Sequence, residues 1–329
     1  MSTKREILMS NLNSRELYPE IEPYKESFIK GDDTHKIFVE ESGNPDGQPI
    51  LFLHGGPGGG TGPKQRRFFD PSHYRIILFD QRGCGKSNPL GETSKNTTKH
   101  LIDDIELIRK ELNISKWILF GGSWGSTLAL AYAIDYPDTV QGIILRGVFL
   151  SRQHELDWFL KDVDIFFPEL HQKLLNHIPN TNKSNLLKKY NELVFSENKK
   201  FAYKAAISWN QFEGSILKLM PPEFSSESNE VDNDFELARA KVQLHYINSN
   251  CFVNGEEILE KSKILKNKPI TIIQGRYDMV CPPKSAYELN QKIPHSKLII
   301  VPDAGHSASE SGTLSALLDA TDEFKKITS

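Results

Sequence analysis

Trp117-Ile-Leu-Phe-Gly-Gly-Ser123-Trp-Gly-Ser-Thr-Leu-Ala-Leu-Ala131 is the most informative stretch of this 329-residue chain. Its apolar first half predicts a buried strand, and its small, apolar second half predicts a helix. Between them, Gly121-x-Ser123-x-Gly125 predicts a turn so sharp that only glycines fit beside the central serine. The hydroxyl would then stand above the sheet edge at a helix N-terminus, which favours developing negative charge. This arrangement is a nucleophile elbow, although the same pattern also occurs by chance in ordinary Gly-rich turns.

Two later strand-and-loop units supply the partners that a nucleophilic serine needs. One apolar run leads to Gly275-Arg-Tyr-Asp278, and another leads to Pro302-Asp-Ala-Gly-His306. In the α/β-hydrolase fold, nucleophile, acid and histidine follow in this chain order, with the last two on loops after late strands. We therefore predict a catalytic triad of Ser123, Asp278 and His306. Asp303 is a competing acid, but it lies on the same short loop as His306 and is better explained as a turn residue.

A third motif, Ile50-Leu-Phe-Leu-His-Gly-Gly-Pro-Gly-Gly-Gly60, places a glycine-rich loop directly after an early strand. Glycines let backbone N–H groups point at a tetrahedral oxyanion without side chains in the way. We predict that the N–H groups of Gly56 and Trp124 form the oxyanion hole. A phosphate-binding loop is the rival use, but the Gly-Lys-Ser/Thr ending is missing here, and Gly85-Lys-Ser87 lacks the upstream glycine at the required spacing.

Composition and charge narrow the class of protein. Hydrophobic residues make up 38% and charged residues 25% of the chain, which is typical of a globular protein. The net charge of -3 argues against nucleic acid or an anionic membrane as a partner. No apolar run is long enough for a membrane span, and the start of the chain lacks the apolar core of a signal peptide. Three cysteines without an export signal predict free thiols in a reducing cytoplasm.

Strand-like and helix-like runs alternate in the first and last parts of the chain, whereas the middle is helical. Fully apolar strands alternating with helices indicate a mostly parallel sheet covered on both faces. We predict an α/β-hydrolase core of residues 1–150 and 255–329, with a helical cap domain, residues 151–254, inserted over the active site. Pro221-Pro222 and an acidic, Ser-rich loop through Asp234 interrupt the cap. The predicted strands are 36–42, 50–53, 75–79, 117–120, 142–146, 270–274 and 298–301, and the predicted helices are 98–112, 126–135, 154–166, 183–193, 235–246, 284–291 and 313–325.

Six short strings are much narrower signals than the general hydrolase pattern: His54-Gly-Gly-Pro-Gly-Gly-Gly60, Asp80-Gln-Arg-Gly-Cys-Gly-Lys-Ser87, Phe120-Gly-Gly-Ser-Trp-Gly-Ser126, Leu145-Arg-Gly-Val-Phe149, Gly275-Arg-Tyr-Asp278 and Ala304-Gly-His306. Together they resemble the proline iminopeptidases, also called prolyl aminopeptidases, over nearly the whole chain. The resemblance implies a serine exopeptidase that releases N-terminal proline from peptides through a prolyl-enzyme ester. It implies no metal and no organic cofactor, and its partners would be peptides with a free N-terminal proline.

The resemblance also implies a site for the free amino terminus, built from glutamates of the cap. Trp209-Asn-Gln-Phe-Glu213 resembles the family's Trp-Glu-Gly segment, which makes Glu213 the first amine anchor. The family's Ala-Arg-Ile-Glu-x-His-Tyr string reads Ala240-Lys-Val-Gln243-Leu-His-Tyr246 here, so Gln243 replaces the second glutamate. A protonated N-terminal proline has two N–H donors, and Glu213 and the Gln243 amide oxygen still offer one acceptor each. One negative charge is lost, which Glu236 on the same helix is placed to replace.

Other residues resemble the family's pocket for the proline ring, namely Trp124, Phe149 and Phe159. Without the resemblance, Phe149 and Phe159 would be interpreted as core residues. Arg146 is a candidate substrate-binding residue at a strand end, where it either orients the cap carboxylates or pairs with a neighbour. Cys281 follows Asp278 closely, so a thiol near the pocket would make the enzyme sensitive to thiol reagents.

Other functions use the same fold. A broader aminopeptidase, or an esterase or amidase acting on small molecules, would share the triad, and the anchor at Glu213 is the feature that distinguishes them. A non-catalytic binding protein of this fold would typically lack one of the triad residues, all of which are present. A dehalogenase or epoxide hydrolase would have aspartate in place of Ser123.

Overall fold

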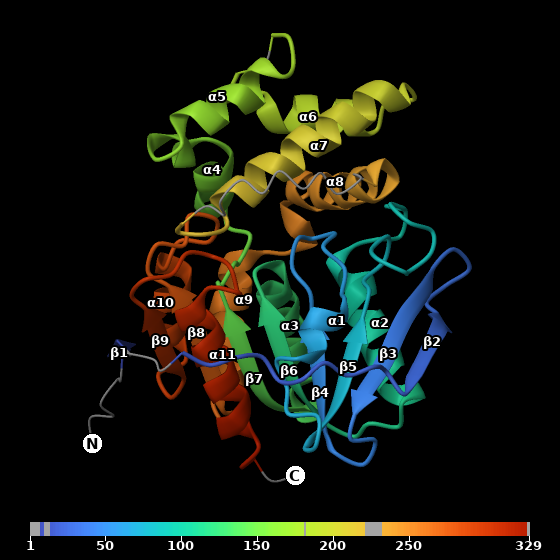
Figure 1. Ribbon diagram of the computed structural model, residues 1–329, viewed down its shortest axis with the longest axis vertical. Helices are drawn as coiled ribbons and strands as arrows, with labels where there is room; N and C mark the ends of the chain where they lie inside the picture. The colour runs from blue at the N-terminus through green and yellow to red at the C-terminus, as the bar shows by residue number, and fades with distance from the viewer. Residues whose placement is uncertain (1–6, 10–13, 181, 221–231, 328–329) are drawn as a thin grey trace.

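A mostly parallel sheet forms the centre of the molecule (Figure 1). This computed structural model describes residues 7–9, 14–180, 182–220 and 232–327. Within these residues the sheet has nine strands in the order β1-β9-β8-β7-β6-β4-β5-β3-β2, and only the β2–β3 and β3–β5 pairs are antiparallel. The strands are β1 (Ile7–Met9), β2 (Lys25–Lys30), β3 (Lys36–Gly43), β4 (Gln48–Leu53), β5 (Tyr74–Phe79), β6 (Trp117–Gly122), β7 (Val140–Arg146), β8 (Ile270–Gly275) and β9 (Lys297–Val301).

Helices cover both faces of the sheet, which explains why the central strands are apolar on both sides. Every residue of β6 and β8 is buried, and Leu119 of β6 lies opposite Leu51 of β4 and Ile143 of β7. Two separate hydrophobic clusters form on the two faces. One face packs against α2 (Thr98–Glu111), α3 (Trp124–Asp135), α9 (Gly255–Lys261) and α10 (Lys284–Lys292), and the other against α11 (Ser311–Phe324) and the segment after α1 (Pro63–Arg66).

Five of the described helices, α4 to α8, lie beyond the carboxyl ends of the parallel strands and are called the cap below (Figure 1). They bury a third hydrophobic cluster of their own, which includes Tyr190, Trp209 and Phe212. Helix α8 joins the two parts, because its Leu244 belongs to the cap cluster while its Tyr246 belongs to the main core. The cap helices are α4 (Gln153–Leu160), α5 (Pro168–Asn176), α6 (Leu186–Val194), α7 (Lys199–Ile216) and α8 (Asn233–Asn248).

The predicted strands and core helices are present, with ends that shift by up to two residues, and the cap helices predicted at 183–193 and 235–246 correspond to α6 and α8, with ends that shift by up to three. The helix predicted at 154–166 is wrong in its length, because α4 ends at Leu160 and a separate 3-10 turn covers Asp162–Ile165. Six described strands and α-helices have no counterpart among the predicted ones, namely β1, β2, α1, α5, α7 and α9. Residues 221–231, with Pro221-Pro222 and most of the acidic loop, lie outside the described residues. None of the described helices is both long and apolar enough to cross a lipid bilayer.

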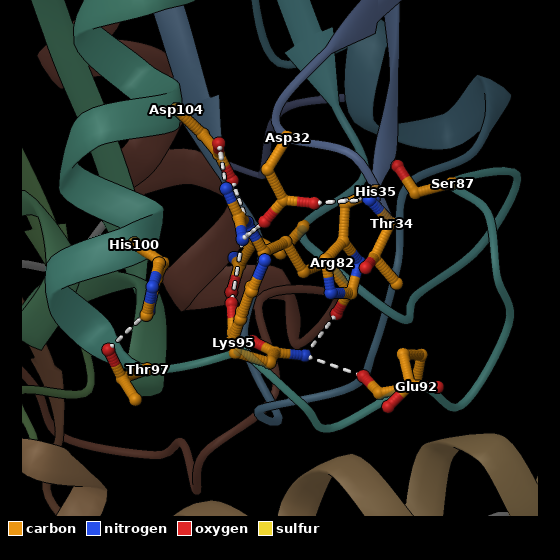
Figure 2. Close-up of polar contacts among 12 residues, drawn as sticks. Asp32, Thr34, His35, Arg82, Ser87, Glu92, Lys95, Thr97, His100 and Asp104 are labelled. Atoms are coloured by element: carbon orange, nitrogen blue, oxygen red, sulfur yellow. Dashed lines mark hydrogen bonds and ion pairs between the residues drawn. The ribbon is translucent and has the colours of Figure 1, made fainter.

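Arg82 fixes the loop that follows β5. Its Nε and Nη2 donate to the two carboxylate oxygens of Asp104 on α2, each at 2.7 Å, and Nη1 donates to Asp32 at 2.6 Å. Figure 2 shows the guanidinium between these two aspartates, with the backbone carbonyl of Lys95 as a further acceptor. A buried cation needs such pairing. The cluster therefore ties the β2–β3 turn, the loop after β5 and α2 into one unit.

Candidate active site

Ser123 occupies a strained turn between β6 and α3. Its φ is 58° and its ψ is -126°, a conformation that non-glycine residues rarely adopt. The flanking glycines permit it: a Cβ on Gly125 would lie 2.0 Å from the Leu53 carbonyl oxygen, and one on Gly121 would lie 2.2 Å from the Gly125 oxygen. The Ser123 N–H donates to the Arg146 carbonyl at 2.8 Å, which holds the turn against β7. This geometry is that of a nucleophile elbow.

Asp278 and His306 meet on the loops after β8 and β9. His306 Nδ1 lies 2.7 Å from Asp278 Oδ2, and both side chains are buried. The carboxylate is held in place by further donors, because Oδ1 accepts from the N–H groups of Val280 at 3.0 Å and Cys281 at 2.7 Å. Gln274 Nε2 donates to Oδ2 at 3.1 Å. These contacts fix the carboxylate so that it orients the imidazole.

Arg146 defines the tautomer of the histidine. Its Nη1 donates to His306 Nε2 at 3.0 Å and to the His306 carbonyl at 2.8 Å. A guanidinium only donates, so Nε2 accepts and Nδ1 carries the proton, as a general base requires. The Nε2 lone pair thus points to Arg146. The Ser123 hydroxyl instead lies next to the Cys281 thiol, with Oγ 4.0 Å from Sγ. Two roles were considered for Arg146, orienting the cap carboxylates or pairing with a neighbour. Its contacts with His306 support the second.

Gln81, which the sequence analysis did not single out, links the two segments that carry the predicted oxyanion donors. Its Nε2 donates to the His54 carbonyl at 2.9 Å, and its Oε1 accepts from Trp124 Nε1 at 2.9 Å. The Gln81 N–H donates to His54 Nε2 at 3.0 Å, so Nδ1 carries the proton of a neutral ring, whose pKa burial lowers. Gly56 lies in this loop with a φ of 116°, and Trp124 begins α3, where N–H groups have no helical partner.

A pocket opens over Ser123 between the sheet and the cap. Its polar side chains include Glu155, Glu213 and Gln243, and Phe149 and Phe159 form part of an apolar wall. The indole of Trp124 does not belong to the lining, because it packs against Tyr246 with ring centroids 5.1 Å apart. The lining residues are Gly56, Pro57, Ser123, Phe149, Glu155, Leu156, Phe159, Glu213, Gln243, Ile247, Val280 and Cys281.

Glu213 of α7 faces α8 with both carboxylate oxygens engaged. Oε1 accepts from Gln243 Nε2 at 2.9 Å, and Oε2 forms an ion pair with Arg239 Nη2 at 2.8 Å. Gln243 Oε1 accepts from Trp209 Nε1 at 2.6 Å, which fixes the amide orientation because an indole N–H only donates. Gln243 Nε2 also donates to the Gly56 carbonyl at 3.2 Å. The predicted anchor residues therefore lie together, next to the glycine-rich loop.

Two other glutamates do not have the positions relative to the pocket that were expected from the sequence. Glu236 accepts from Asn210 Nδ2 at 2.6 Å and does not line the pocket, so it leaves the charge lost at Gln243 uncompensated there. Glu155 lines the pocket but was not predicted. Its carboxylate accepts from the N–H groups of Leu150 and Arg152 and from Ser285 Oγ. The signal in the sequence was its place three residues after Arg152, where a glutamate caps a helix N-terminus.

The described cysteines are free and buried. Burial, with the nearby carboxylates of Asp278 and Glu155, raises the pKa of the Cys281 thiol well above its usual range. Cys281 is therefore a neutral, buried thiol beside the nucleophile, which argues against the sensitivity to thiol reagents expected from the sequence. In the part of the chain that the structure describes, no group of three or more His, Cys, Asp or Glu residues is placed to hold a metal ion.

Comparisons with known proteins agree with the fold. Residues 48–313 match the family described as alpha/beta hydrolase fold. The chain is 46% identical to a probable proline iminopeptidase of Leptolyngbya boryana, over 94% of this chain and 97% of that protein. It is 43% identical to the proline iminopeptidase of Arabidopsis thaliana, over 96% of this chain and 84% of that protein. A putative aryl esterase from Burkholderia cenocepacia, 18% identical, shares the fold with a TM-score of 0.61 over 92% of this chain and 98% of that one.

Proposed function

The chain belongs to the proline iminopeptidase family of α/β hydrolases, and from this membership we propose how it releases N-terminal proline from peptides. The observation that carries the proposal is a buried carboxylate, Glu213, in the same pocket as Ser123. An aminopeptidase needs a negative group near its nucleophile, because its substrates carry a positive charge two bonds from the carbonyl carbon that is attacked. An esterase has no such need.

The pocket accommodates proline by combining an apolar wall with a polar end. The pyrrolidine ring packs between Phe149 and Phe159, and its ammonium donates to Glu213 and to the free lone pair of the Gln243 amide oxygen. This placement brings the prolyl carbonyl over Ser123 Oγ, and the rest of the peptide leaves through the opening of the pocket. The substrate residues that follow the proline therefore contribute little to specificity.

The reaction follows from the roles of the triad. The His306 imidazole turns from Arg146 to Ser123 and accepts the hydroxyl proton as Oγ attacks the carbonyl carbon, while Asp278 orients and stabilises the imidazolium. The N–H groups of Gly56 and Trp124 stabilise the oxyanion. His306 then protonates the departing peptide amine. A water molecule, activated by His306, hydrolyses the prolyl ester on Ser123 and frees proline.

We also propose that the protein works in the cytoplasm. The three cysteines are free and buried, and none forms a disulfide. Free thiols of this kind persist in a reducing compartment.

A panel of aminoacyl arylamides tests the proposed function. We expect kcat/KM to be highest for Pro-arylamide, with Ala-, Leu- and Arg-arylamide following well behind, because only the pyrrolidine ring fills the apolar wall. N-acetyl-Pro-arylamide should be a very poor substrate, since it has no ammonium for Glu213. A flat profile across the panel, or ready cleavage of the acetylated substrate, would contradict the proposal and favour a broad esterase or amidase.

A further inference from the structure

We propose that Arg239 is a specificity-determining residue: its guanidinium occupies the amine anchor in the free enzyme and competes with the substrate ammonium for Glu213. The proposal rests on the proposed function, because it assigns a competitor to the group that binds the N-terminus. The sequence positions of Arg239 and Glu213 do not by themselves indicate that the two side chains meet. Arg239 and Glu213 lie on different cap helices, and they meet only because α7 and α8 pack side by side.

The contacts at Glu213 resemble those expected with a bound ammonium. One carboxylate oxygen accepts from the Gln243 amide and the other from Arg239, so the guanidinium N–H stands at the Glu213 oxygen where an N–H donor of an N-terminal proline is expected. The pair has no net charge. Position 243 carries a neutral glutamine, and the other carboxylate of the pocket, Glu155, already accepts from two backbone N–H groups and from Ser285 Oγ. Glu213 is therefore the carboxylate assigned to the incoming ammonium, and Arg239 neutralises its charge.

Arg239 is held loosely enough to be displaced. Its side chain is 25% exposed, whereas that of Glu213 is 8% exposed, so Arg239 is the more exposed partner of the pair. Within the described residues, the buried Arg239 Nε has no hydrogen-bond partner, and the ion pair to Glu213 is the contact that holds the head group. A flexible side chain with one anchoring contact can swing towards solvent when a second cation arrives.

The backbone of Arg239 is fixed, in contrast to its head group. Arg239 packs against the glycine-rich loop so closely that a Cβ on Gly58 would lie 2.7 Å from the Arg239 carbonyl oxygen. It also lies one helical turn before Gln243, on the same face of α8. The guanidinium is therefore delivered to the anchor by a rigid helix, and only the side chain has to move.

The two roles that Arg239 could have predict opposite changes in ammonium binding when its guanidinium is removed. If it competes with the substrate, two cations share one carboxylate, and like charges at this separation oppose each other. Removing the guanidinium then strengthens binding of the ammonium. If Arg239 only supports Glu213, its removal loosens the carboxylate and weakens binding.

The test compares Arg239→Gln with the wild type on Pro-arylamide and on an aryl acetate, which has no ammonium. We expect Arg239→Gln to lower KM for Pro-arylamide by roughly fivefold or more, with kcat and the aryl acetate parameters nearly unchanged. Pyrrolidine, which carries the ammonium without an acyl group, should inhibit this variant at correspondingly lower concentrations. Arg239→Lys keeps the charge and should resemble the wild type.

Lys241→Gln is the matched control, because it removes the same charge from α8 at a residue that lies over the Phe195 ring and away from Glu213. It should leave KM for Pro-arylamide unchanged. An unchanged or higher KM in Arg239→Gln, or an equal fall in KM in Lys241→Gln, would overturn the competition. A wild type that hydrolyses aryl acetate but not Pro-arylamide would instead reject the proposed function, and the inference with it.

Discussion

Replacement of Ser123 is predicted to lower activity more than replacement of any other single side chain. Replacing it by alanine removes the attacking oxygen, and loss of a triad nucleophile costs at least about 10⁴-fold in kcat. We expect Ser123→Ala to show this loss on Pro-arylamide and on aryl acetate alike, with a thermal midpoint close to that of the wild type. Adding His306→Ala should cost little more, because the triad acts as a unit. Residual activity above a few per cent would remove Ser123 from the mechanism.

Cys281 lies beside the nucleophile but should not replace it. Its thiol has a pKa raised by burial and by neighbouring carboxylates, and a protonated thiol is a poor nucleophile. We expect iodoacetamide at pH 7 to label Cys281 far more slowly than it labels the unfolded chain, as measured by mass spectrometry. Cys281→Ala should retain most of the activity. Fast labelling of the native protein at this residue would show that the thiol is ionised or exposed.

Local motifs predict the reacting residues, and tertiary contacts determine what surrounds them. Ser123 and His306 could be found because a tight turn after an apolar strand leaves a strong local signal. Gln81 and Arg239 could not, because their partners, Trp124 and Glu213, are distant in sequence and are reached only after the helices pack. The same reason explains why Glu236 was expected at the anchor: helical periodicity gives the face of α8 but not which helix packs against it.

The elbow between β6 and α3 depends on the absence of a side chain at Gly125. A Cβ there would lie 2.0 Å from the Leu53 oxygen, so β4 would have to move. We expect Gly125→Ala to lower the thermal midpoint strongly or to prevent folding. Gly214 is the control: within α7 a Cβ there meets nothing within 4 Å, and Gly214→Ala should stabilise the protein by up to about 1 kcal/mol. Similar midpoints for both variants would contradict the close approach at the elbow.

The loop that carries His306 is tied to α7, the helix that carries Glu213. The Leu217 carbonyl accepts from the N–H groups of His306 and Ser307, both at 2.9 Å. Glu310 strengthens this link, since its carboxylate accepts from the N–H groups of Gly305 at 2.9 Å and Leu219 at 2.8 Å. The element that recognises the ammonium thus positions the general base.

Glu310→Ala should therefore impair catalysis without touching the substrate. A misplacement of the imidazole by about 1 Å can cost up to roughly a hundredfold, so we expect kcat to fall by about ten- to a hundredfold on amide and ester alike. KM should change little. Glu323→Ala is the control: Glu323 is an exposed residue of α11 paired with Lys297, and its removal should be neutral. A loss confined to KM would show that Glu310 acts on binding instead.

At the level of elements, the apolar strands were predictable because burial on both faces leaves continuous apolar runs. Helix α7 was not, because its sequence mixes lysines, aromatic residues and polar residues around the segment that bears Glu213. Edge strand β2 also escaped prediction, since four of its six residues are exposed and three are charged. Tertiary packing, rather than local pattern, defines both elements.

Burial of cysteine thiols and tyrosine hydroxyls makes the stability of the whole molecule fall at alkaline pH. Burial raises the pKa of Cys251 and of Tyr190 to about 12 each, and raises those of Tyr74 and Tyr132 further. These groups ionise more easily in the unfolded chain, so their contribution to stability is complete below the unfolded values of 9.0 for Cys and 10.0 for Tyr and is lost as the pH rises above them. We expect the thermal midpoint to fall steadily above about pH 9. A midpoint that stays flat to pH 11 would contradict these shifts.

The most direct test of the amine anchor compares wild type and Glu213→Ala on Pro-arylamide and on aryl acetate. Removing one partner of a buried charge pair costs about 3–5 kcal/mol, or roughly two to four orders of magnitude in kcat/KM. The anchor predicts a loss of this size for Pro-arylamide and nearly unchanged hydrolysis of aryl acetate, which carries no ammonium. Equal losses on the two substrates, or full cleavage of Pro-arylamide by Glu213→Ala, would contradict it.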